Sequence, residues 1–410
     1  MIGSTYLKNR SHALIMSAPY KKLDHFLSTL SNSEIKLKKV LVITGGRAQM
    51  APMIIKEALR RGHIIHSCTR HWPLPKYYHI TWEKLEDNQL NNPKAWQTLF
   101  HRISKGADRL FLVNTLGTAV APAGKTLSDI NEKPILAAVE ALQTLQIKKR
   151  IGHISSIAAT YLPDDKKLLT TFDPQGLEYC LGRKRVDTLL EKNEIPTTIL
   201  RPGFVFNDLS NGSRIDTGHD YSPEQFTELL VHPIIGSGKQ MHQPVYIGDL
   251  LEGLFNGMET EKSHLVNAVG PEIMSQEDMI KFFLNLAQKP FKPVKIPYEV
   301  ASIIAKYFPK GRLAPYSVSL LRHLEEQRPL PLNIEPFQNL VKKSLTSIGQ
   351  IYKKNQNQTV IFTKSPILEH MKEIITCIAI NPEARRDFIT ISTLYGPALI
   401  LDAIKRYFGL

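Results

Sequence analysis

Two adjacent glycines, Gly45 and Gly46, follow a short apolar run and precede a helical pattern. A strand that ends in glycine and opens into a helix directs the amide end of that helix toward whatever lies above the strand, which suits a pyrophosphate. The usual fingerprint has three glycines, for the tight turn, for close approach of the phosphates and for helix–strand packing. In a G-x-x-G-x-x-G alignment the second and third positions here are Ala48 and Ala51. The loop predicts a tighter phosphate site, and a plain strand–helix turn is the alternative.

A basic residue, Arg70, closes the next apolar run, at the position where dinucleotide-binding folds contact the adenosine ribose. A carboxylate there would accept a hydrogen bond from the ribose 2′-OH, whereas a guanidinium can pair with a 2′-phosphate through two hydrogen bonds. Arg70, with His71 beside it, therefore predicts NADP(H) rather than NAD(H) as the cofactor. The alternative is a solvated arginine that merely follows a strand.

These residues need a scaffold, and the sequence between residues 38 and 206 alternates strand-like with helix-like patterns. The segments predicted as buried strands are 40–43, 64–69, 109–113, 151–154 and 197–200. The segments predicted as helices from their apolar spacing are 50–59, 135–145 and 179–192. Such alternation requires right-handed crossovers and a parallel sheet. The predicted fold class is α/β, a doubly wound parallel Rossmann-type sheet with a smaller mixed C-terminal substrate region and a helical tail.

The pattern divides the chain into four predicted parts. They are a basic N-terminal extension (1–37), a dinucleotide-binding Rossmann domain (38–206), a substrate-binding or lid region (207–350) and a helical C-terminal extension (351–410). Pro, Gly and Asn are frequent between residues 207 and 243, which is typical of loops that close over a ligand. In the third part, Ser275 is the predicted N-cap of a helix that carries Asp278 at its third position.

The charge of the chain is strongly positive, with 52 Lys and Arg against 38 Asp and Glu and a net charge of +14. Such a surface favours anionic partners. The positive residues are spread out and form no block interleaved with aromatics, so nucleic-acid binding is not predicted.

Cysteine usage and hydropathy indicate the compartment. Cys68, Cys180 and Cys377 form no CxxC pair, so the sequence predicts no disulfide framework, no metal site and a reducing, cytoplasmic location. The uncharged stretch 388–401 is too short to span a bilayer. Peripheral membrane contact through the basic N-terminus or the helices after residue 360 stays open.

Seven stretches, in order and spacing, resemble the extended or atypical short-chain dehydrogenase/reductases, the NAD-dependent epimerase/dehydratase group. They are VLVITGGRAQMA (40–51), RRGHIIHSCTR (60–70), IGHISSIAATY (151–161), EYCLGRKRVDTLL (178–190), TTILRPGFVF (197–206), PVYIGDLLEGL (244–254) and VNAVGPEIMSQEDM (266–279). Within that group the chain looks most like the branch containing the NADPH-binding accessory subunit of respiratory complex I and related reductase-like proteins.

The resemblance implies roles for individual residues. Gly45 matches the first glycine of the cofactor loop, and Asn131 matches an asparagine that shapes the active site around the substrate. Tyr179 matches the catalytic tyrosine of a Y-x-x-x-K motif. Pro202 and Gly203 match the segment that passes the nicotinamide.

The chain departs from the family pattern where the chemistry would occur. The lysine four residues after the tyrosine is replaced by Arg183, which keeps the charge but not the compact donor. In the family that lysine bonds the nicotinamide ribose and helps the phenol to shuttle a proton. The family's Ser/Thr, which binds the substrate oxygen, is replaced by Ile157, and Ser156 or Thr160 could substitute only if the substrate approached differently.

Two functions therefore remain open. One is an NADP(H)-dependent oxidoreductase or epimerase-like enzyme, with an altered active site, that acts on a small-molecule or nucleotide-linked substrate. The other is a non-catalytic scaffold or assembly protein stabilised by NADPH. The predicted catalytic residues are Tyr179, Arg183 and Ser156, and the predicted cofactor-binding residues are Gly45, Gly46, Arg47, Ala48, Gln49, Met50, Arg70, Asn114, Pro202 and Gly203.

Overall fold

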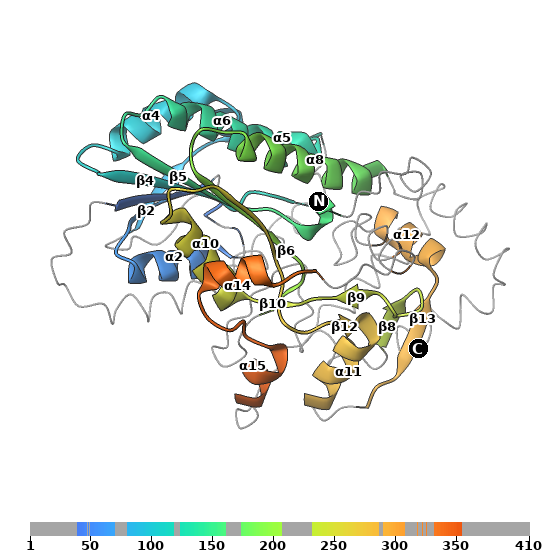
Figure 1. Cartoon of the computed structure of the whole chain (residues 1–410). Coiled ribbons are helices and arrows are strands. Elements are labelled where there is room, and N and C mark those ends of the chain that lie inside the picture. The colour runs from blue at the N-terminus through green and yellow to red at the C-terminus, as the bar shows by residue number, and fades with distance from the viewer. Residues whose placement is uncertain are drawn as a thin grey trace, which may run out of the picture.

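The computed structural model describes most of the chain between residues 39 and 354 (Figure 1). The described residues are 39–46, 48, 50–69, 80–118, 124–160, 174–206, 232–286, 290–307, 318, 322, 325 and 332–354. The N-terminal extension, the predicted tail helices after residue 360, Arg47, Gln49 and Arg70 lie outside them. No helix in the described parts combines the length and apolarity needed to cross a membrane.

A single parallel sheet forms the centre of the molecule, as predicted, and it has seven strands, two more than the five predicted. Its spatial order is β3 (Ile80–Lys84), β2 (Ile64–Thr69), β1 (Lys39–Ile43), β4 (Arg109–Asn114), β5 (Lys148–Ile154), β6 (Thr197–Pro202) and β11 (His264–Ala268). The chain runs outward from β1 through β2 and β3 and then returns to place β4 on the other side of β1. Crevices at such reversals, outside the carboxyl ends of the strands, are where open α/β sheets bind ligands.

Helices cover both faces of the sheet, because each strand points apolar side chains in both directions. On one face, Val40 and Val42 pack under α4 (Pro93–Ile103), α6 (Lys133–Gln143) and α8 (Pro174–Glu191). On the other, Leu41 and Ile43 pack under α2 (Ala51–Arg60), α10 (Ile247–Met258) and α14 (Glu335–Val341). Figure 1 shows the two helical layers on opposite sides of the strands, so the doubly wound Rossmann-type prediction is confirmed.

Some elements differ from the sequence prediction. Helix α8 begins at Pro174, so Tyr179 lies in its second turn and not at a helix start. Three elements, β3, α3 (Asp87–Leu90) and α4, are not among those predicted from the sequence. Asn92 nevertheless caps α4 by accepting from the amide of Lys94, and Pro93 opens the helix. The fourfold division of the chain stays a prediction, but the sheet takes its seventh strand, β11, from the segment assigned to the lid region.

A smaller mixed α/β part follows the sheet. Three strand pairs, β7 (Val205–Phe206) with β10 (Val245–Tyr246), β9 (Met241–His242) with β12 (Met274–Ser275), and β8 (His232–Ile235) with β13 (Pro293–Ile296), accompany α11 (Gln276–Leu286) and α12 (Tyr298–Tyr307). Its core contains Phe206, Ile234 and Phe283. The predicted cap of α11 is confirmed, because the Ser275 hydroxyl accepts from the Asp278 amide at 3.0 Å.

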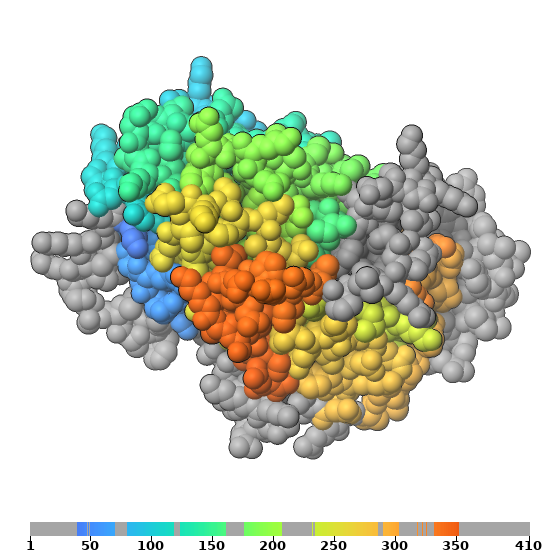
Figure 2. Space-filling view, viewed as in Figure 1, coloured from blue at the N-terminus to red at the C-terminus, as the bar shows by residue number. Residues whose placement is uncertain are grey.

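The segment 332–354 joins the two parts, and Figure 2 shows it lying across α10 and reaching the side of α11. Asp249, buried in the first turn of α10, accepts from the amide of Thr346 at 2.6 Å and from its hydroxyl at 3.1 Å. Glu272, in the loop after β11, accepts from the amide of Ile348 at 2.7 Å, at the start of α15 (Ile348–Lys354). The buried carboxylate of Asp249 and the half-buried carboxylate of Glu272 hold the segment in place.

Candidate functional site

The glycine turn after β1 is packed between the ends of β2 and β4. The Gly46 amide donates to the Cys68 carbonyl at 2.8 Å. A Cβ at position 46 would lie 2.2 Å from Ser67 Oγ and 2.9 Å from the Cys68 carbonyl oxygen, and one at Gly45 would lie 2.7 Å from Thr115 Oγ1. Contact with neighbouring strands therefore requires both glycines, whether or not a ligand lies above them.

The amide end of α2 faces the same edge of the sheet. The N-cap, Met50, makes no side-chain capping bond, and the first turn carries no acidic residue. The amides of Gly46, Ala48 and Ala51 donate to main-chain carbonyls, and Pro52 has no N–H. A phosphate here would be attracted chiefly by the helix dipole, with fewer direct amide bonds than a glycine-rich loop offers.

Replacing Gly46 with alanine is expected to lower the free energy of unfolding by about 1–3 kcal/mol, as overpacking of a filled site does. The matched control is Gly349→Ala in α15, where the nearest atom to the new Cβ is 3.5 Å away and alanine favours the helix. Urea unfolding of both variants checks this. Equal stability of the two variants would contradict the packing described.

Asn114, predicted to bind cofactor, ties three strand ends together. Its buried Oδ1 accepts from the Thr44 hydroxyl at 2.7 Å and from the Leu116 amide at 3.3 Å. Its Nδ2 lies 2.9 Å from Nδ1 of His153 on β5. Asn114 therefore fixes the start of the loop that follows β4, and its side-chain amide is already engaged within the protein.

Asn131, the predicted substrate-site residue, fixes the other end of that loop. It is the last residue of α5 (Leu127–Asn131). Its side chain accepts from the Thr118 amide at 2.8 Å and donates to the Thr118 carbonyl at 2.9 Å. Gly117 lies between these two clamps, so residues 115–118 form a rigid wall of the crevice.

Tyr179 and Arg183, one turn apart on α8, face this wall. Both residues are 7% exposed, and the guanidinium carbon lies 5.2 Å from the centre of the tyrosine ring. A Cβ at Gly117 would lie only 2.0 Å from Arg183 Nη2. Within the described residues, Arg183 Nε and Nη1 are buried and have no hydrogen-bond partner. Buried donors of this kind are costly, so this guanidinium is poised for an acceptor that the described chain does not supply.

A buried charged network lies one further turn along α8. Arg201 on β6 donates from Nε to Asp187 Oδ2 at 2.6 Å, and His153 Nε2 lies 3.6 Å from Asp187 Oδ1. Burial lowers the pKa of His153 to about 3, and Arg183 and Arg201 act in the same direction. Burial raises the pKa of the Asp187 carboxyl, while hydrogen bonding to Arg201 opposes that rise. At neutral pH, His153 is therefore uncharged beside a buried ion pair.

The residues after β5 and β6 complete the edge. The Ser156 hydroxyl accepts from the Ala158 amide at 3.2 Å, and the Thr160 hydroxyl donates to the Ile157 carbonyl at 2.7 Å. Ile157 is buried at the start of the short helix η1 (Ile157–Thr160), and a Cβ at Gly203 would lie 4.0 Å from it. Ile157 therefore makes an apolar contact at the position where the resembled family has a serine or threonine hydroxyl.

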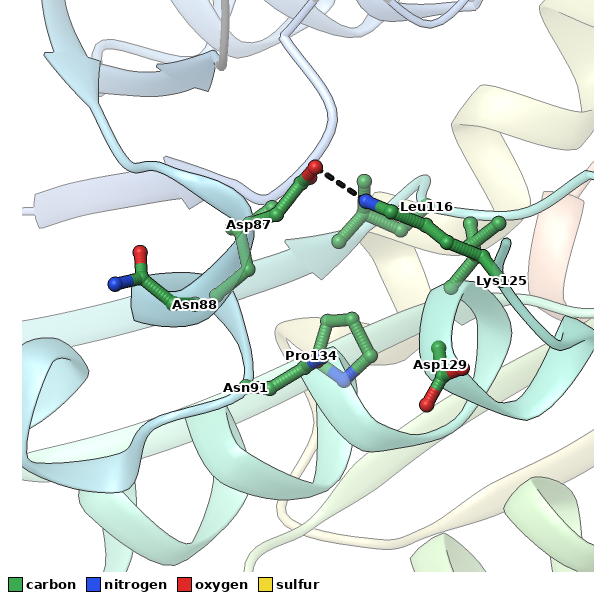
Figure 3. Close-up of a pocket in the computed structure, with 9 residues that line it drawn as sticks. Asp87, Asn88, Asn91, Leu116, Lys125, Asp129 and Pro134 are labelled. Atoms are coloured by element: carbon green, nitrogen blue, oxygen red, sulfur yellow. Dashed lines mark hydrogen bonds and ion pairs between the residues drawn. The ribbon is translucent and has the colours of Figure 1, made fainter. Parts of the chain in front are cut away.

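An open pocket of about 270 Å³ lies on the α3 side of the same loop. In Figure 3, Asp87 and Asn88 of α3 stand opposite Lys125 and Asp129, and an ion pair joins Asp87 to Lys125. The apolar lining residues are Leu90, Leu116, Ile130 and Pro134. Leu116 also borders the glycine turn, because its Cδ2 would lie 3.3 Å from a Cβ at Gly45.

The fold brings most of the predicted site residues to one edge of the sheet, since they follow β1, β4, β5 and β6 or project from α8. Arg47, Gln49 and Arg70 lie outside the described residues, so their roles stay predictions. Sequence reasoning missed Gly117 and the pocket after β3. The only available signal was the polar run after residue 85, which has no glycine and no recognised motif.

A parallel sheet whose strand order reverses between β1 and β4, covered by helices on both faces, defines a Rossmann-type α/β protein. No protein-family model matches the chain, and no curated protein matches its sequence. Solved structures do match its fold. UDP-glucuronic acid 4-epimerase from Bacillus cereus, in complex with UDP-glucuronic acid and NAD, is 16% identical and superposes with a TM-score of 0.54 over 78% of this chain and 98% of that chain.

Two further structures agree. The epimerase Mth375 from Methanothermobacter thermautotrophicus gives a TM-score of 0.52 at 15% identity, over 78% of this chain and 91% of its own. The protein Pal from Bacillus thuringiensis gives 0.55 at 11% identity, over 78% of this chain and 97% of its own. These superpositions show a shared fold over 78% of this chain. The resemblance to the complex I accessory subunit is not tested by them and stays a prediction.

Proposed function

We propose that this chain is a nicotinamide-dinucleotide-binding protein of the epimerase/dehydratase type with an altered active site. Its cofactor in this proposal is NADP(H), and its activity is that of an oxidoreductase or epimerase-like enzyme on a small-molecule or nucleotide-linked substrate. The observation that carries the proposal is the placement of Tyr179, with a buried cation against its ring, at the same sheet edge as the glycine turn and the pocket after β3.

The residues present fit a dinucleotide at this edge. The apolar side chains of Leu116 and Ile130 suit the flat faces of an adenine, and Asp87 and Asn88 supply polar groups for its edge. Gly45 leaves the strand end free of a side chain, and Arg70 would pair with a 2′-phosphate. Arg183 lies at the opposite end of the crevice, between Gly117 and the ring of Tyr179.

When bound, the cofactor supplies hydride transfer at the nicotinamide. The chain supplies the proton chemistry: the Tyr179 phenol exchanges a proton with the substrate oxygen, beside the buried guanidinium of Arg183. The Ser156 hydroxyl is able to donate to a substrate oxygen, because it acts as the acceptor in its bond with the Ala158 amide. Loss of the usual hydroxyl at position 157 restricts how the substrate oxygen is held.

NADPH is expected to stabilise the folded protein. At 100 times its dissociation constant, a ligand that binds only the folded state adds about 2.7 kcal/mol to the free energy of unfolding. Thermal unfolding with NADPH, NADH and ATP at equal concentration measures this, and we expect the largest shift with NADPH. Absence of a shift with both dinucleotides would refute cofactor binding, and a larger shift with NADH would refute only the NADP(H) assignment.

Turnover by the purified protein with NADPH, over a panel of carbonyl compounds and sugar nucleotides, is expected to fall by about 10²–10⁴-fold in Tyr179→Phe. Binding of NADPH should change little, since the substitution removes one hydroxyl. The control is Tyr246→Phe in β10, a half-buried tyrosine that packs on Phe206. If Tyr179→Phe and the control turn over equally, Tyr179 is not the proton carrier.

A non-catalytic role as an NADPH-stabilised scaffold or assembly protein is the second candidate, and a specific observation favours it. Ile157 is 7% exposed and Arg183 is packed against Gly117, so two groups of the usual catalytic set are not arranged for chemistry. In that case NADPH stabilises the fold, and no substrate in the panel turns over.

A cytoplasmic location and peripheral membrane contact also stay proposals, because the segments concerned lie outside the described residues. The net charge of +14 favours acidic lipid surfaces. Co-sedimentation with acidic liposomes, comparing the full chain with a chain truncated after residue 354, tests the contribution of the tail. Equal sedimentation would exclude that contribution.

A further inference from the structure

The crevice at the carboxyl edge of the sheet is open at its α3 end and filled by a side chain at its α8 end. On the α3 side, the pocket of about 270 Å³ is open between α3 and α5. On the α8 side, the space between the loop after β4 and the helix is taken by the guanidinium of Arg183. Gly117 is the point of contact, since a Cβ there would lie 2.0 Å from Nη2, 2.9 Å from the guanidinium carbon and 3.1 Å from Nη1.

Arg183 fills the space beside Gly117 because an arginine side chain is long and ends in a flat group. A lysine at position 183 would end in one compact ammonium group, whereas the flat guanidinium reaches further and lies on surfaces. Here it lies between the backbone of Gly117 and the ring of Tyr179, 5.2 Å from the ring centre. Any side chain at position 117 would prevent this contact.

The surroundings hold the guanidinium in this place. Asp187, fully buried one turn further along α8, attracts it, although Arg201 makes the direct bond to that carboxylate. The wall opposite cannot retreat, because Asn131 fixes the backbone of Thr118 through two hydrogen bonds. Removal of the guanidinium from this space would therefore require rotation of the Arg183 side chain itself.

We propose that Arg183 is a specificity-determining residue that closes the nicotinamide end of the crevice. It reduces the affinity for a complete dinucleotide to about that of its adenosine half, because only the complete dinucleotide must displace the guanidinium from Gly117. The inference rests on the proposed function, since it requires a dinucleotide to lie across this edge. A nucleotide that has the adenosine half but no nicotinamide riboside can bind without moving the Arg183 guanidinium.

The test is isothermal titration calorimetry with NADPH and with its adenosine fragment, 2′,5′-ADP, and in parallel with NADH and ADP. Wild-type protein is compared with Arg183→Ala and with Arg183→Lys, which keeps the charge on a shorter group. The matched control is Arg185→Ala on the same helix, because Arg185 pairs with Glu132 and is half exposed. Circular dichroism confirms that each variant is folded, and Arg183→Lys carries the test if the alanine variant does not fold.

In wild type and in Arg185→Ala we expect the dinucleotide and its fragment to bind with similar affinity. In Arg183→Ala, dinucleotide affinity should rise about tenfold, or about 1.4 kcal/mol, while that of the fragment is unchanged. Arg183→Lys should also raise the affinity for the dinucleotide relative to that for its fragment. If dinucleotide binding weakens in both variants while fragment binding persists, Arg183 holds the ribose and the closure is wrong. If none of the four ligands binds any of the proteins, the proposed function fails as well.

Discussion

Replacing Arg201 with methionine is expected to lower the free energy of unfolding by about 3–5 kcal/mol, the usual effect of leaving one member of a buried ion pair without its partner. The Asp187 side chain is fully buried, and its Oδ2 lies 2.6 Å from Arg201 Nε. Without Arg201, that carboxylate must either stay charged in an apolar setting or take up a proton. Urea-induced unfolding at pH 7 measures the loss.

The control for this substitution is Lys133→Met, which breaks an ion pair of the same 2.6 Å length to Asp129 at the surface. Surface pairs contribute about 0–1 kcal/mol, so the contrast isolates the effect of burial. The double variant Arg201→Met/Asp187→Leu should recover much of the lost stability, because the buried charge is then gone. If Arg201→Met and Lys133→Met have the same free energy of unfolding, the buried Asp187–Arg201 ion pair adds no more stability than a surface pair.

Lowering the pH from 7.5 to 5 is expected to remove about 4 kcal/mol of stability through two buried histidines. Burial lowers the pKa of His63 to about 4 and that of His153 to about 3. Both side chains have a folded-state pKa below the unfolded value of about 6.5. Their contribution is therefore fully present above pH 6.5 and is lost as the pH falls toward the folded values. Each loses about 2 kcal/mol at pH 5.

The carboxyl groups do not account for this window. The pKa of Glu57, of Glu83 and of Glu325 is lowered in the fold by hydrogen bonds from basic or polar side chains, so these groups lose their contributions mainly below pH 4.5. Burial also lowers the pKa of His242 to about 4, so by the same reasoning this histidine adds about 2 kcal/mol to the roughly 4 kcal/mol that His63 and His153 lose together. Denaturant unfolding at several pH values between 5 and 7.5 measures how steeply the free energy of unfolding falls as the pH is lowered.

Substitution of His63 isolates one half of this effect. Its ring lies 4.9 Å from the ring of Phe111 and 5.9 Å from that of Phe255, and both ring nitrogens are buried without a hydrogen-bond partner in the described chain. His63→Leu should therefore keep or raise stability at pH 7.5 and reduce the pH-dependent loss by about 2 kcal/mol. His101→Leu, at an exposed position of α4, should leave the loss unchanged. An unaltered slope in His63→Leu would assign the acid sensitivity to other groups.

The buried charged and polar groups behind the candidate site also affect the position of Arg183. His153, Asp187 and Arg201 lie next to the helix turn that carries Arg183, so a variant that disturbs them also changes what faces Gly117. Binding experiments on the Arg201 and His153 positions should therefore be read only after stability has been measured. The glycine turn and the pocket after β3 lie apart from this network and should respond less.

Sequence alone determined the class of fold, because buried parallel strands and amphipathic helices have different periods. The chain alternates between these two patterns over most of residues 39–206. The sequence also determined the edge at which the candidate site residues meet, since residues that follow successive parallel strands come together at their carboxyl ends. The cap at Ser275 and the turn at Gly45 were readable because local backbone geometry restricts the residue types. Residues 80–103 were missed because their polar start concealed a short edge strand and a capped helix.

Only the tertiary structure decided what each polar side chain touches. The amide of Asn114 is used within the protein, Asn131 binds main chain, and the guanidinium of Arg183 rests on Gly117, a residue 66 positions away in the chain. Such contacts depend on rotamers and on distances between segments far apart in sequence, which periodicity and motif spacing do not encode. The physical reason is that hydrogen-bond partners are chosen by proximity after packing, whereas the pattern of apolar residues fixes only which faces are buried.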